Sequence, residues 1–336
     1  MTVADPLTHD AAKLPGDRLA TLALRTLRTG PVCILAVVCA TMAALSPYFL
    51  TTQNLANIGF QASFVAVLAL GQLLVIITRG IDLSVGATVG LAGVAAAGAA
   101  SGGATTLATF CAAGLTVGLV NGAVLVYGRV SNPFIVTLGT LGIARGLALV
   151  LSDGETRTGL PPVVGTLGSG SVAGIPVPVI LVAALALTLG TLLGHSQWGR
   201  WVYAVGGNPE AARRAGVPAD RVLLSVYALC GLLAGIAAIL VAGRTDAASP
   251  QAGQLLELDA ITAVIIGGAS FLGGRGRVIN VIAGALIIGV IRNGLDLIGV
   301  SPFWQLIAVG LLVILSLELE VVRGRLEQRL RSRAAA

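Results

Sequence analysis

Charged residues are scarce in this sequence. Only 11% of the 336 residues are Asp, Glu, Lys or Arg, whereas soluble globular proteins usually contain about 25%. An unpaired charge is costly in the hydrocarbon of a membrane, so this depletion predicts an integral membrane protein. The length would suggest roughly two or three soluble domains, but that relation does not hold for a chain that crosses a membrane many times.

The side chains that most often bind metals or catalyse reactions are few and scattered. The two histidines, His9 and His195, are isolated from each other. No Ser/His/Asp arrangement or pair of neighbouring carboxylates is visible, so we predict no metal site and no catalytic site. The four cysteines lie inside apolar runs without a C-x-x-C pair, which is typical of small packing residues; they are Cys33, Cys39, Cys111 and Cys230.

Lysine is almost missing, since Lys13 is the single one in the chain. The sequence therefore has no G-x-x-x-x-G-K-[ST] phosphate loop, and we expect no ATP hydrolysis by a fold of that type. It also lacks the series of buried Asp, Glu and His residues that proton-coupled carriers use. A transporter of this composition must take its energy from another protein.

Long apolar runs fill most of the chain. A helix needs about 20 apolar residues to cross the hydrocarbon, and ten candidate stretches predict an all-α, polytopic membrane protein. The eighth is short and ends in a glycine-rich turn, which is typical of a broken helix. The ten are Pro31–Tyr48, Ile58–Ile77, Val85–Ala100, Thr105–Tyr127, Pro133–Leu151, Pro176–Gly194, Val222–Ala242, Ala260–Leu272, Val278–Leu295 and Phe303–Leu317.

The positive charges indicate the orientation, because Lys and Arg accumulate on the cytoplasmic side. With a cytoplasmic N-terminus, the inner segments hold 17 of the 21 Lys and Arg residues, and the outer loops hold only Arg157 and Arg244. We therefore predict a cytoplasmic N-terminal tail (1–30), a transmembrane domain (31–320) and a basic cytoplasmic C-terminal tail (321–336). The net charge of +6 is then a topology signal and not a sign of nucleic-acid binding.

Glycine is abundant, with 45 residues, and it often recurs every four positions. Small residues at this spacing let membrane helices approach closely; the sets are Gly86/Gly90, Gly114/Gly118/Gly122, Gly142/Gly146 and Gly231/Gly235. The two halves are also weakly similar. "VSNPFIV" from Val130 matches "VSPFWQL" from Val300, and "IITRGIDLSVG" from Ile76 matches "IIGGASFLGG" from Ile265. Five spans in each half would place the repeats in opposite orientation, a common plan in transporters.

Polar residues near the breaks are candidates for a pathway or hinge. In "GIDLSVG", Asp82 or Ser84 can cap the third span, while Gly80 and Gly86 permit unusual backbone angles at a hinge. The second break adds Gly267 and Gly268.

Two arginines fall within predicted spans. Arg145 lies near the middle of the fifth, where it serves a pathway, contacts carbonyls or reaches the outer surface. We expect Arg292 to form an i,i+4 ion pair with Asp296.

The polar stretch "GNPEAARRAGVPADR" begins at Gly207 and separates two apolar runs. Asn208 suits an N-cap, Pro209 the first helical position and Glu210 the positive end of the helix dipole. Gly216 suits the left-handed position after the last turn. A helix of about seven residues is far below the roughly 12–15 needed for stability in water. Other contacts must hold it, either a cytoplasmic partner or the rest of an ordinary capped loop.

Three segments resemble the permease subunit of ribose-type monosaccharide ABC importers. They are "GQLLVIITRGIDLSVGATVGLAG" (Gly71–Gly93), "VYAVGGNPEAARRAGV" (Val202–Val217) and "ELDAITAVIIGGASFLGGRGRV" (Glu257–Val278). The resemblance runs from about Pro31 to Leu317 and is weaker over the outer loop Asp153–Ile175. It implies a vitamin-B12-importer-like fold, a second permease subunit (identical or a paralogue), cytoplasmic ATPase subunits that hold ATP and Mg, and an extracytoplasmic sugar-binding protein.

By the same resemblance, the polar stretch looks like the coupling helix that contacts the ATPase. Its candidate coupling residues are Gly207, Asn208, Pro209, Glu210, Ala211, Arg213, Arg214 and Gly216.

The predicted function is that of a non-enzymatic permease subunit in a bacterial inner membrane, importing a pentose or hexose. This chain itself would bind no cofactor. Alternatives are a related permease for nucleosides, autoinducer-like sugars or branched amino acids, an ion-coupled secondary carrier, and a membrane scaffold without transport.

Overall fold

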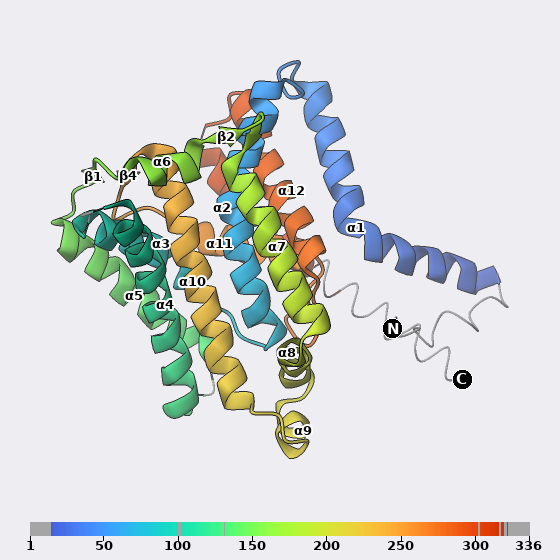
Figure 1. Cartoon of the computed structure of the whole chain (residues 1–336). Helices are drawn as coiled ribbons and strands as arrows, with labels where there is room; N and C mark the ends of the chain where they lie inside the picture. Colours follow the sequence, from blue (N-terminus) through green and yellow to red (C-terminus); the bar gives the residue numbers. More distant parts are fainter. Residues whose placement is uncertain are drawn as a thin grey trace.

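The computed structural model is an almost entirely helical bundle (Figure 1). It describes residues 15–99, 102–130, 132–301, 303–315, 317–318 and 321, with side chains from residue 30 onward. The helices are α1 (Pro15–Leu45), α2 (Thr52–Ile77), α3 (Val85–Gly98), α4 (Gly103–Tyr127), α5 (Pro133–Ser152), α6 (Pro162–Ser169), α7 (Val177–His195), α8 (Gln197–Gly207), α9 (Pro209–Arg214), α10 (Ala219–Thr245), α11 (Leu256–Ile266) and α12 (Val278–Leu297). A further apolar helix covers Phe303–Leu315.

Among the described residues, four two-residue strands form two small antiparallel pairs. β1 (Arg157–Thr158) pairs with β4 (Ala247–Ala248), and β2 (Ser171–Val172) pairs with β3 (Ile175–Pro176). The first pair joins the loop after α5 to the loop after α10, and the second closes a hairpin before α7. The strands therefore fasten loops at one end of the bundle and build no sheet of their own.

A helix lies at each of the ten predicted apolar stretches, but their lengths differ. Within the described residues, six helices are long and apolar enough to cross a membrane: α2, α4, α5, α7, α10 and α12. The segments Gly30–Leu45, α3 and Phe303–Leu315 are apolar but shorter, and α11 has only 11 residues. Ten crossings therefore stay a prediction. α1 begins at Pro15, inside the predicted N-terminal tail, and residues 1–14 and 322–336 of the tails lie outside the described residues.

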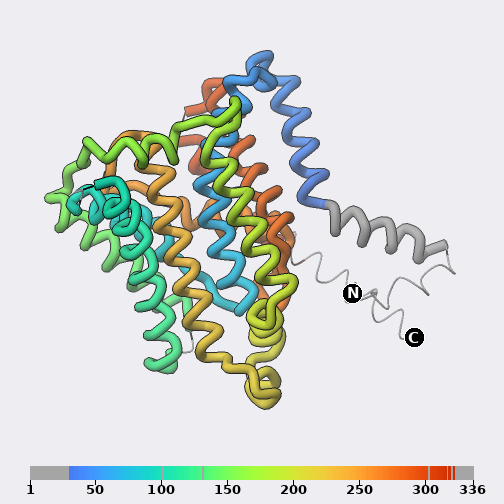
Figure 2. Tube along the Cα trace, viewed as in Figure 1, coloured from blue at the N-terminus to red at the C-terminus, as the bar shows by residue number. Residues whose placement is uncertain are grey.

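α2 and α10 form the centre of the bundle (Figure 2). In its most apolar window α2 is 83% buried, whereas the outer helix α5 is 17% buried. α2 packs on α12, α11, α7 and α10, while α10 also packs on α4, α3 and α6. The buried core of the domain is therefore centred on these two helices.

The contact between α4 and α10 depends on glycine. A Cβ at Gly114 would overlap the backbone of Gly231, and one at Gly118 would overlap the carbonyl of Tyr227. The reverse also holds, because a Cβ at Gly235 would overlap the carbonyl of Phe110. Close packing through small residues is therefore confirmed for these sets.

Gly142 and Gly146 on α5 differ from the other glycine sets. No described atom outside the local helix lies within 4 Å of the position that a Cβ would take at either residue. Within the described part of the chain, these two glycines lie on an open face of α5, so the predicted close packing is wrong for them.

The helices of the two predicted halves pack reciprocally. α2 contacts α11 and α12, and in the same way α10 contacts α3 and α4. Each central helix thus packs on the third and fourth helix of the other half. In this arrangement the break between α2 and α3 corresponds to the segment 246–255 between α10 and α11. The Ile265 segment, which resembles the first break in sequence, lies instead between α11 and α12. That sequence match therefore does not identify structurally equivalent segments, since short apolar strings match by chance.

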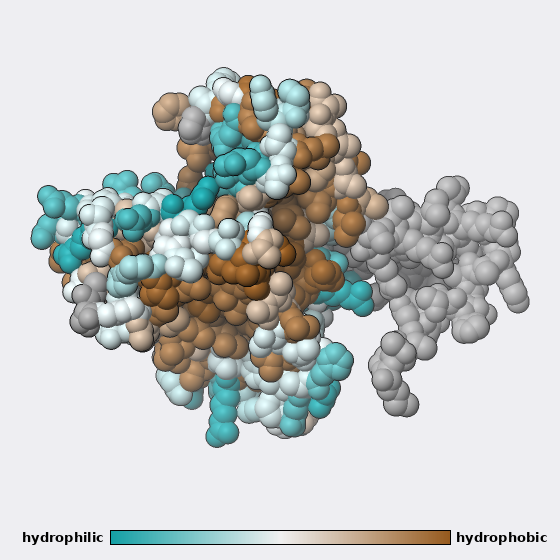
Figure 3. Space-filling model, turned by 45° about the horizontal axis from the view of Figure 1, so that its top comes forward, coloured by the Kyte–Doolittle hydropathy of each residue, from teal (hydrophilic) through white to brown (hydrophobic). Residues whose placement is uncertain are grey.

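The surface is divided by polarity (Figure 3). Hydrophobic residues gather across the middle of the face that is shown, and hydrophilic residues lie toward its ends. The exposed apolar side chains include Ile135, Ile143 and Val150 of α5 and Leu187 of α7. An apolar middle with polar ends is the pattern that a lipid bilayer requires of a protein that spans it.

Candidate functional site

The predicted short helix is present as α9, six residues long. The Asn208 side chain accepts a hydrogen bond from the N–H of Ala211 (3.0 Å), and Pro209 starts the helix. At the other end Gly216 has φ +80°, its N–H bonds to the Arg213 carbonyl, and the N–H of Val217 bonds to the Ala212 carbonyl, both at 3.0 Å. These two bonds form a Schellman motif, so both ends of α9 are capped within the chain.

The charged side chains of α9 point to solvent. Arg214 lies 3.9 Å from Glu210, and both side chains are more than four-fifths exposed. Arg213 contacts Asp220 at the start of α10 at 2.5 Å and is less exposed. Exposed pairs of this kind contribute little stability. Arg213 braces α9 against α10, whereas Arg214 and Glu210 are available for a partner.

α9 is attached to the bundle through Arg79, which follows the end of α2. The Arg79 Nε donates to the carbonyl of Gly206 (2.6 Å), and its Nη2 donates to the carbonyl of Gly207. Arg79 has φ +67°, in the left-handed region that an L-residue rarely adopts. Since the hydrogen bonds made by a charged group are strong, the two contacts to the last turn of α8 offset this strain.

The loop between α11 and α12 joins the same junction. The N–H of Gly274 donates to the carbonyl of Ile77 (2.8 Å), and the Tyr203 hydroxyl of α8 donates to the carbonyl of Gly276 (2.8 Å). Burial raises the pKa of Tyr203, and the nearby positive charge of Arg277 opposes that shift. A Cβ at Gly206 would overlap the Ile77 carbonyl, so only glycine lets α8 approach α2 so closely. Three separate segments therefore meet directly before α9.

The first predicted break is a buried polar cluster. The Asp82 carboxylate accepts hydrogen bonds from the N–H (2.9 Å) and hydroxyl (2.6 Å) of Ser84. The Asn121 amide of α4 donates to the Ser84 hydroxyl (2.9 Å). The Gln72 amide, in the orientation that satisfies both of its ends, bonds to the backbone N–H and carbonyl of Asp82 at 3.1 and 3.2 Å. Asp82 therefore holds Ser84, the residue before α3, but no side-chain cap hydrogen bond is present at the start of α3, so the predicted capping by Asp82 or Ser84 is not confirmed.

Gly80 and Gly86 have a different role from the one predicted. Neither has a positive φ, and the left-handed residue at this break is Arg79. A Cβ at Gly80 would overlap the Tyr227 hydroxyl, and one at Gly86 would overlap the Glu257 carboxylate. These glycines allow close approach of neighbouring helices, so the prediction of unusual backbone angles is wrong for both.

Arg145 reaches across to the loop before α11. Its Nη1 donates to the carbonyls of Pro250 (2.5 Å) and Ala252 (3.0 Å). Of the roles considered for Arg145, the geometry matches contact with carbonyls. The guanidinium holds the non-helical segment 246–255 against α3 and α5, where an unpaired backbone carbonyl would be costly. A pathway role for Arg145 stays a prediction.

In the second break, Gly268 is a left-handed residue, with φ +78°, and Gly267 is not. A Cβ at Gly267 would lie 2.8 Å from the Asn280 carbonyl of α12, so this glycine provides space for the neighbouring helix.

The prediction for Arg292 is also wrong in its partner. Its Nη2 bonds to both carboxylate oxygens of Asp259 at 2.9 and 2.7 Å, whereas Asp296 accepts a hydrogen bond from Gln305 (2.6 Å). The fully buried Asp259 carboxylate of α11 gains more from a cation than the exposed Asp296 does.

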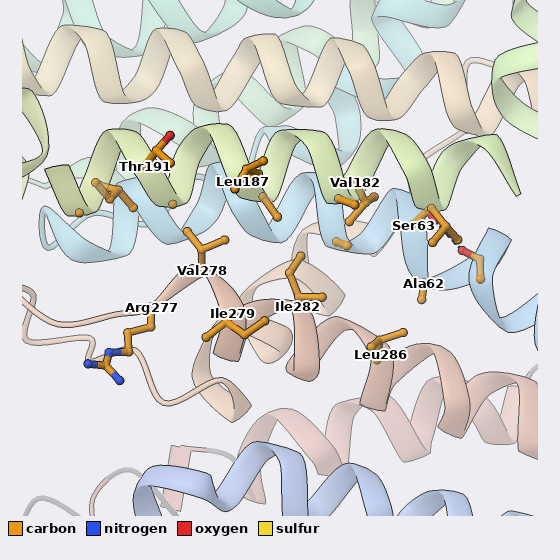
Figure 4. Close-up of a pocket in the computed structure, with 18 of the residues that line it drawn as sticks. Ala62, Ser63, Val182, Leu187, Thr191, Arg277, Val278, Ile279, Ile282 and Leu286 are labelled. Carbon is orange, nitrogen blue, oxygen red and sulfur yellow. Dashed lines mark hydrogen bonds between the residues drawn. The ribbon is translucent and has the colours of Figure 1, made fainter. Parts of the chain in front are cut away.

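An apolar groove of about 790 Å³ lies between α2, α7 and α12. Val182 and Leu187 of α7 and Ile279, Ile282 and Leu286 of α12 line it, with Thr191 and Arg277 toward one end (Figure 4). Its lining offers few groups that could bind a polar solute, and it suits hydrocarbon better.

Sequence reasoning missed the residues that act between elements. Arg79 was only one of the 17 inner Lys and Arg residues that indicated the orientation, and Gln72, Asn121, Glu257 and Asp259 were not singled out. The available signal was a polar side chain inside an apolar run. What each of them contacts depends on residues far away in the sequence, which no local pattern contains.

This bundle of long apolar helices, with buried polar breaks and a capped helix at one end, defines the class of polytopic membrane proteins. The family described as "Branched-chain amino acid transport system / permease component" matches residues 54–317. The ribose import permease protein of Escherichia coli (strain K12) is 40% identical over 289 residues, which cover 84% of this chain and 90% of that protein.

Two further relatives come from the same organism. The D-allose transport system permease protein is 40% identical over 295 residues (87% of this chain, 90% of that protein), and the galactose/methyl galactoside import permease protein is 36% identical over 322 residues (88% and 94%). No solved structure matched the chain. The chain thus belongs to the family of ribose-type sugar ABC import permeases and is a multi-pass inner-membrane protein.

Proposed function

We propose that this chain is the membrane-spanning subunit of an ATP-driven importer for a monosaccharide, either a pentose such as ribose or a hexose such as allose or galactose. The observation that carries the proposal is α9: a helix of six residues, capped at both ends and presenting Glu210 and Arg214 to solvent. Such a helix is a rigid docking element, and the sequence has no phosphate loop of its own.

In this proposal α9 is the coupling helix for a separate ATPase subunit, which carries the ATP and Mg. ATP binding moves α9, and the junction of Arg79, Gly206 and Gly274 passes that movement to α2, α8 and the loop before α12. The break at Asp82 and Ser84 follows Arg79 directly in the chain, so it receives the movement first.

The remaining architecture is proposed on the same basis. Ten helices in two inverted halves, in a vitamin-B12-importer-like fold, pair with a second permease subunit and receive sugar from an extracytoplasmic binding protein. The reciprocal packing of α2 and α10 supports the two halves. The tails at 1–30 and 321–336 are cytoplasmic, consistent with the excess of arginine in the predicted inner segments.

A branched amino acid is the second candidate substrate, because the matching family description names that transport system. The most similar relatives reported above are sugar permeases, which favours a sugar. A secondary carrier and a scaffold receive no support from either comparison.

The test is transport in proteoliposomes that contain this chain, its ATPase and its binding protein. We expect ATP-dependent uptake of labelled ribose, allose or galactose that needs all three components. Uptake by the chain alone on an ion gradient would make it a secondary carrier, and uptake of leucine but no sugar would reassign the substrate.

A matched pair of variants tests the role of α9 in the same assay. Arg214→Glu should lower uptake while the ATPase still hydrolyses ATP, and Arg221→Glu, an exposed arginine outside α9, should transport normally. Equal uptake by the two variants would remove α9 as the coupling element.

A further inference from the structure

A second, smaller cavity differs in chemistry from the apolar groove. It has a volume of about 230 Å³ and lies between α2, α11, α12 and the last apolar helix. Its walls carry Gln61, Asp259, Arg292, Asp296 and Gln305. Since polar groups are expensive inside a membrane domain, a cavity that collects five of them from four helices is a candidate functional site.

Two of these groups lack partners. The Oε1 of Gln61 and the Nε of Arg292 are buried, and neither has a hydrogen-bond partner among the described residues. One is an acceptor and the other a donor, and a buried group left unpaired is costly. A ligand that both donates and accepts hydrogen bonds would satisfy both, and a hydroxyl group does so.

The charges in the cavity disfavour an anionic ligand. Asp259 is neutralised by Arg292 (2.7 Å), whereas Asp296 accepts from the neutral Gln305 amide (2.6 Å) and keeps a negative charge that can accept hydrogen bonds from hydroxyl groups. A zwitterionic amino acid would need an uncompensated cation for its carboxylate, but the positive charge of Arg292 is already compensated by Asp259. Phe64 adds a flat apolar wall beside the polar ones, against which the C–H face of a sugar ring can pack.

The position of the cavity also fits passage across the membrane. Gln61 precedes Ile77 by 16 residues, or about 24 Å along α2 at 1.5 Å per residue. Because Ile77 lies at the α9 junction, the cavity is nearer the opposite end of the bundle. With α9 on the cytoplasmic side, a solute that enters from outside meets this cavity first.

We propose that this cavity is a transient binding site for a neutral monosaccharide inside the permease. The inference rests on the proposed function and adds to it a location and a ligand chemistry. The volume corresponds to roughly eight waters of liquid at about 30 Å³ each, which is enough room for a small polyol.

The test uses thiol labelling in a chain whose four cysteines are replaced by alanine. In the assembled importer, Gln61→Cys should react with a membrane-impermeant thiosulfonate added from the outside, and free ribose, allose or galactose should slow the reaction. Ser63→Cys, on the same helix but lining the apolar groove, should not react. If the Gln61→Cys chain does not assemble into the importer, Gln305→Cys is labelled in its place.

Two results overturn the proposal: no labelling at either glutamine position, or labelling that none of the three sugars slows. Uptake by the unmodified importer is measured in parallel. If sugar uptake is normal and protection is absent, the cavity proposal fails while the function stands. If no sugar is transported, the function itself fails.

Discussion

At the scale of single residues, Arg79 illustrates how an unfavourable backbone conformation is retained. The left-handed region costs an L-residue about 1–2 kcal/mol, and glycine would avoid that cost. The arginine side chain instead reaches the two carbonyls that end α8, next to α9. Hydrogen bonds to charged groups contribute about 1.5–3 kcal/mol each, so the contacts outweigh the strain. The arginine side chain therefore serves the junction, and the turn by itself does not require it.

We expect Arg79→Ala to separate ATP hydrolysis from transport. The substitution leaves the left-handed backbone in place but removes both contacts to α8, at a cost of about 2 kcal/mol or more at the junction. Uptake should fall at least about tenfold, as expected when about 1.4 kcal/mol is lost, while ATP hydrolysis by the partner continues. The assays are sugar uptake and phosphate release in proteoliposomes.

Arg129→Ala is the control for this prediction. Arg129 also has a positive φ, at 52°, and it is exposed after α4. The same backbone strain is therefore present in both variants, and Arg129→Ala should transport normally. A similar loss in both variants would show that the backbone, and not the junction, is responsible.

Residue-scale predictions succeeded where the cause is local. The caps of α9 follow from Asn208, Pro209 and Gly216, because each acts within a few residues of its own position. The partner of Arg292 could not be predicted, because Asp259 is 33 positions away and becomes adjacent only when α11 packs on α12. The i,i+4 rule considers only residues one turn apart on the same helix, so it takes no account of a buried carboxylate on a neighbouring helix.

At the scale of elements, glycine spacing defines the approach of α4 and α10. The sequence could identify the repeated glycines, but it could not say which helix each set meets. Gly118 packs against the Tyr227 backbone, whereas Gly146 has no described neighbour within 4 Å. Glycines spaced four residues apart therefore allow close helix packing where they face another helix, as on α4, and have no such role where they lie on an open face, as on α5.

We expect Gly118→Val to destabilise the purified chain, because its side chain would overlap backbone atoms that cannot move aside. Overpacking of this kind costs about 1–3 kcal/mol. The midpoint of thermal aggregation in detergent should fall by several degrees, measured by the loss of the monodisperse peak after heating. Gly146→Val makes the same change at an open position and should leave the midpoint unchanged. Equal shifts would mean that valine disturbs the helices themselves.

At the scale of the whole molecule, the number of membrane crossings determines which loops lie on the same side. The sequence marks ten stretches, and in the part of the chain that the structure describes six helices meet the length and hydropathy needed to cross alone. The packing of the helices favours ten crossings over six. Ile77, Gly206 and Gly274 meet at one end, although α3 and α11 lie between them along the chain. α3 and α11 must therefore each complete a crossing, together with the non-helical segment that precedes each of them, so that the chain comes back to the same end of the bundle.

The two topologies place one loop on opposite sides. With ten crossings, Leu272 lies on the same side as Glu210 of α9; with only the six long helices crossing, it lies with Glu155, after α5. All three side chains are exposed. In the cysteine-free chain in intact cells, we expect an impermeant thiol reagent to label Glu155→Cys only. Leu272→Cys and Glu210→Cys should react after the membrane is permeabilised. Labelling of Leu272→Cys from outside would mean that α3 and α11 do not complete a crossing, and the inverted repeat of five spans would then fail with them.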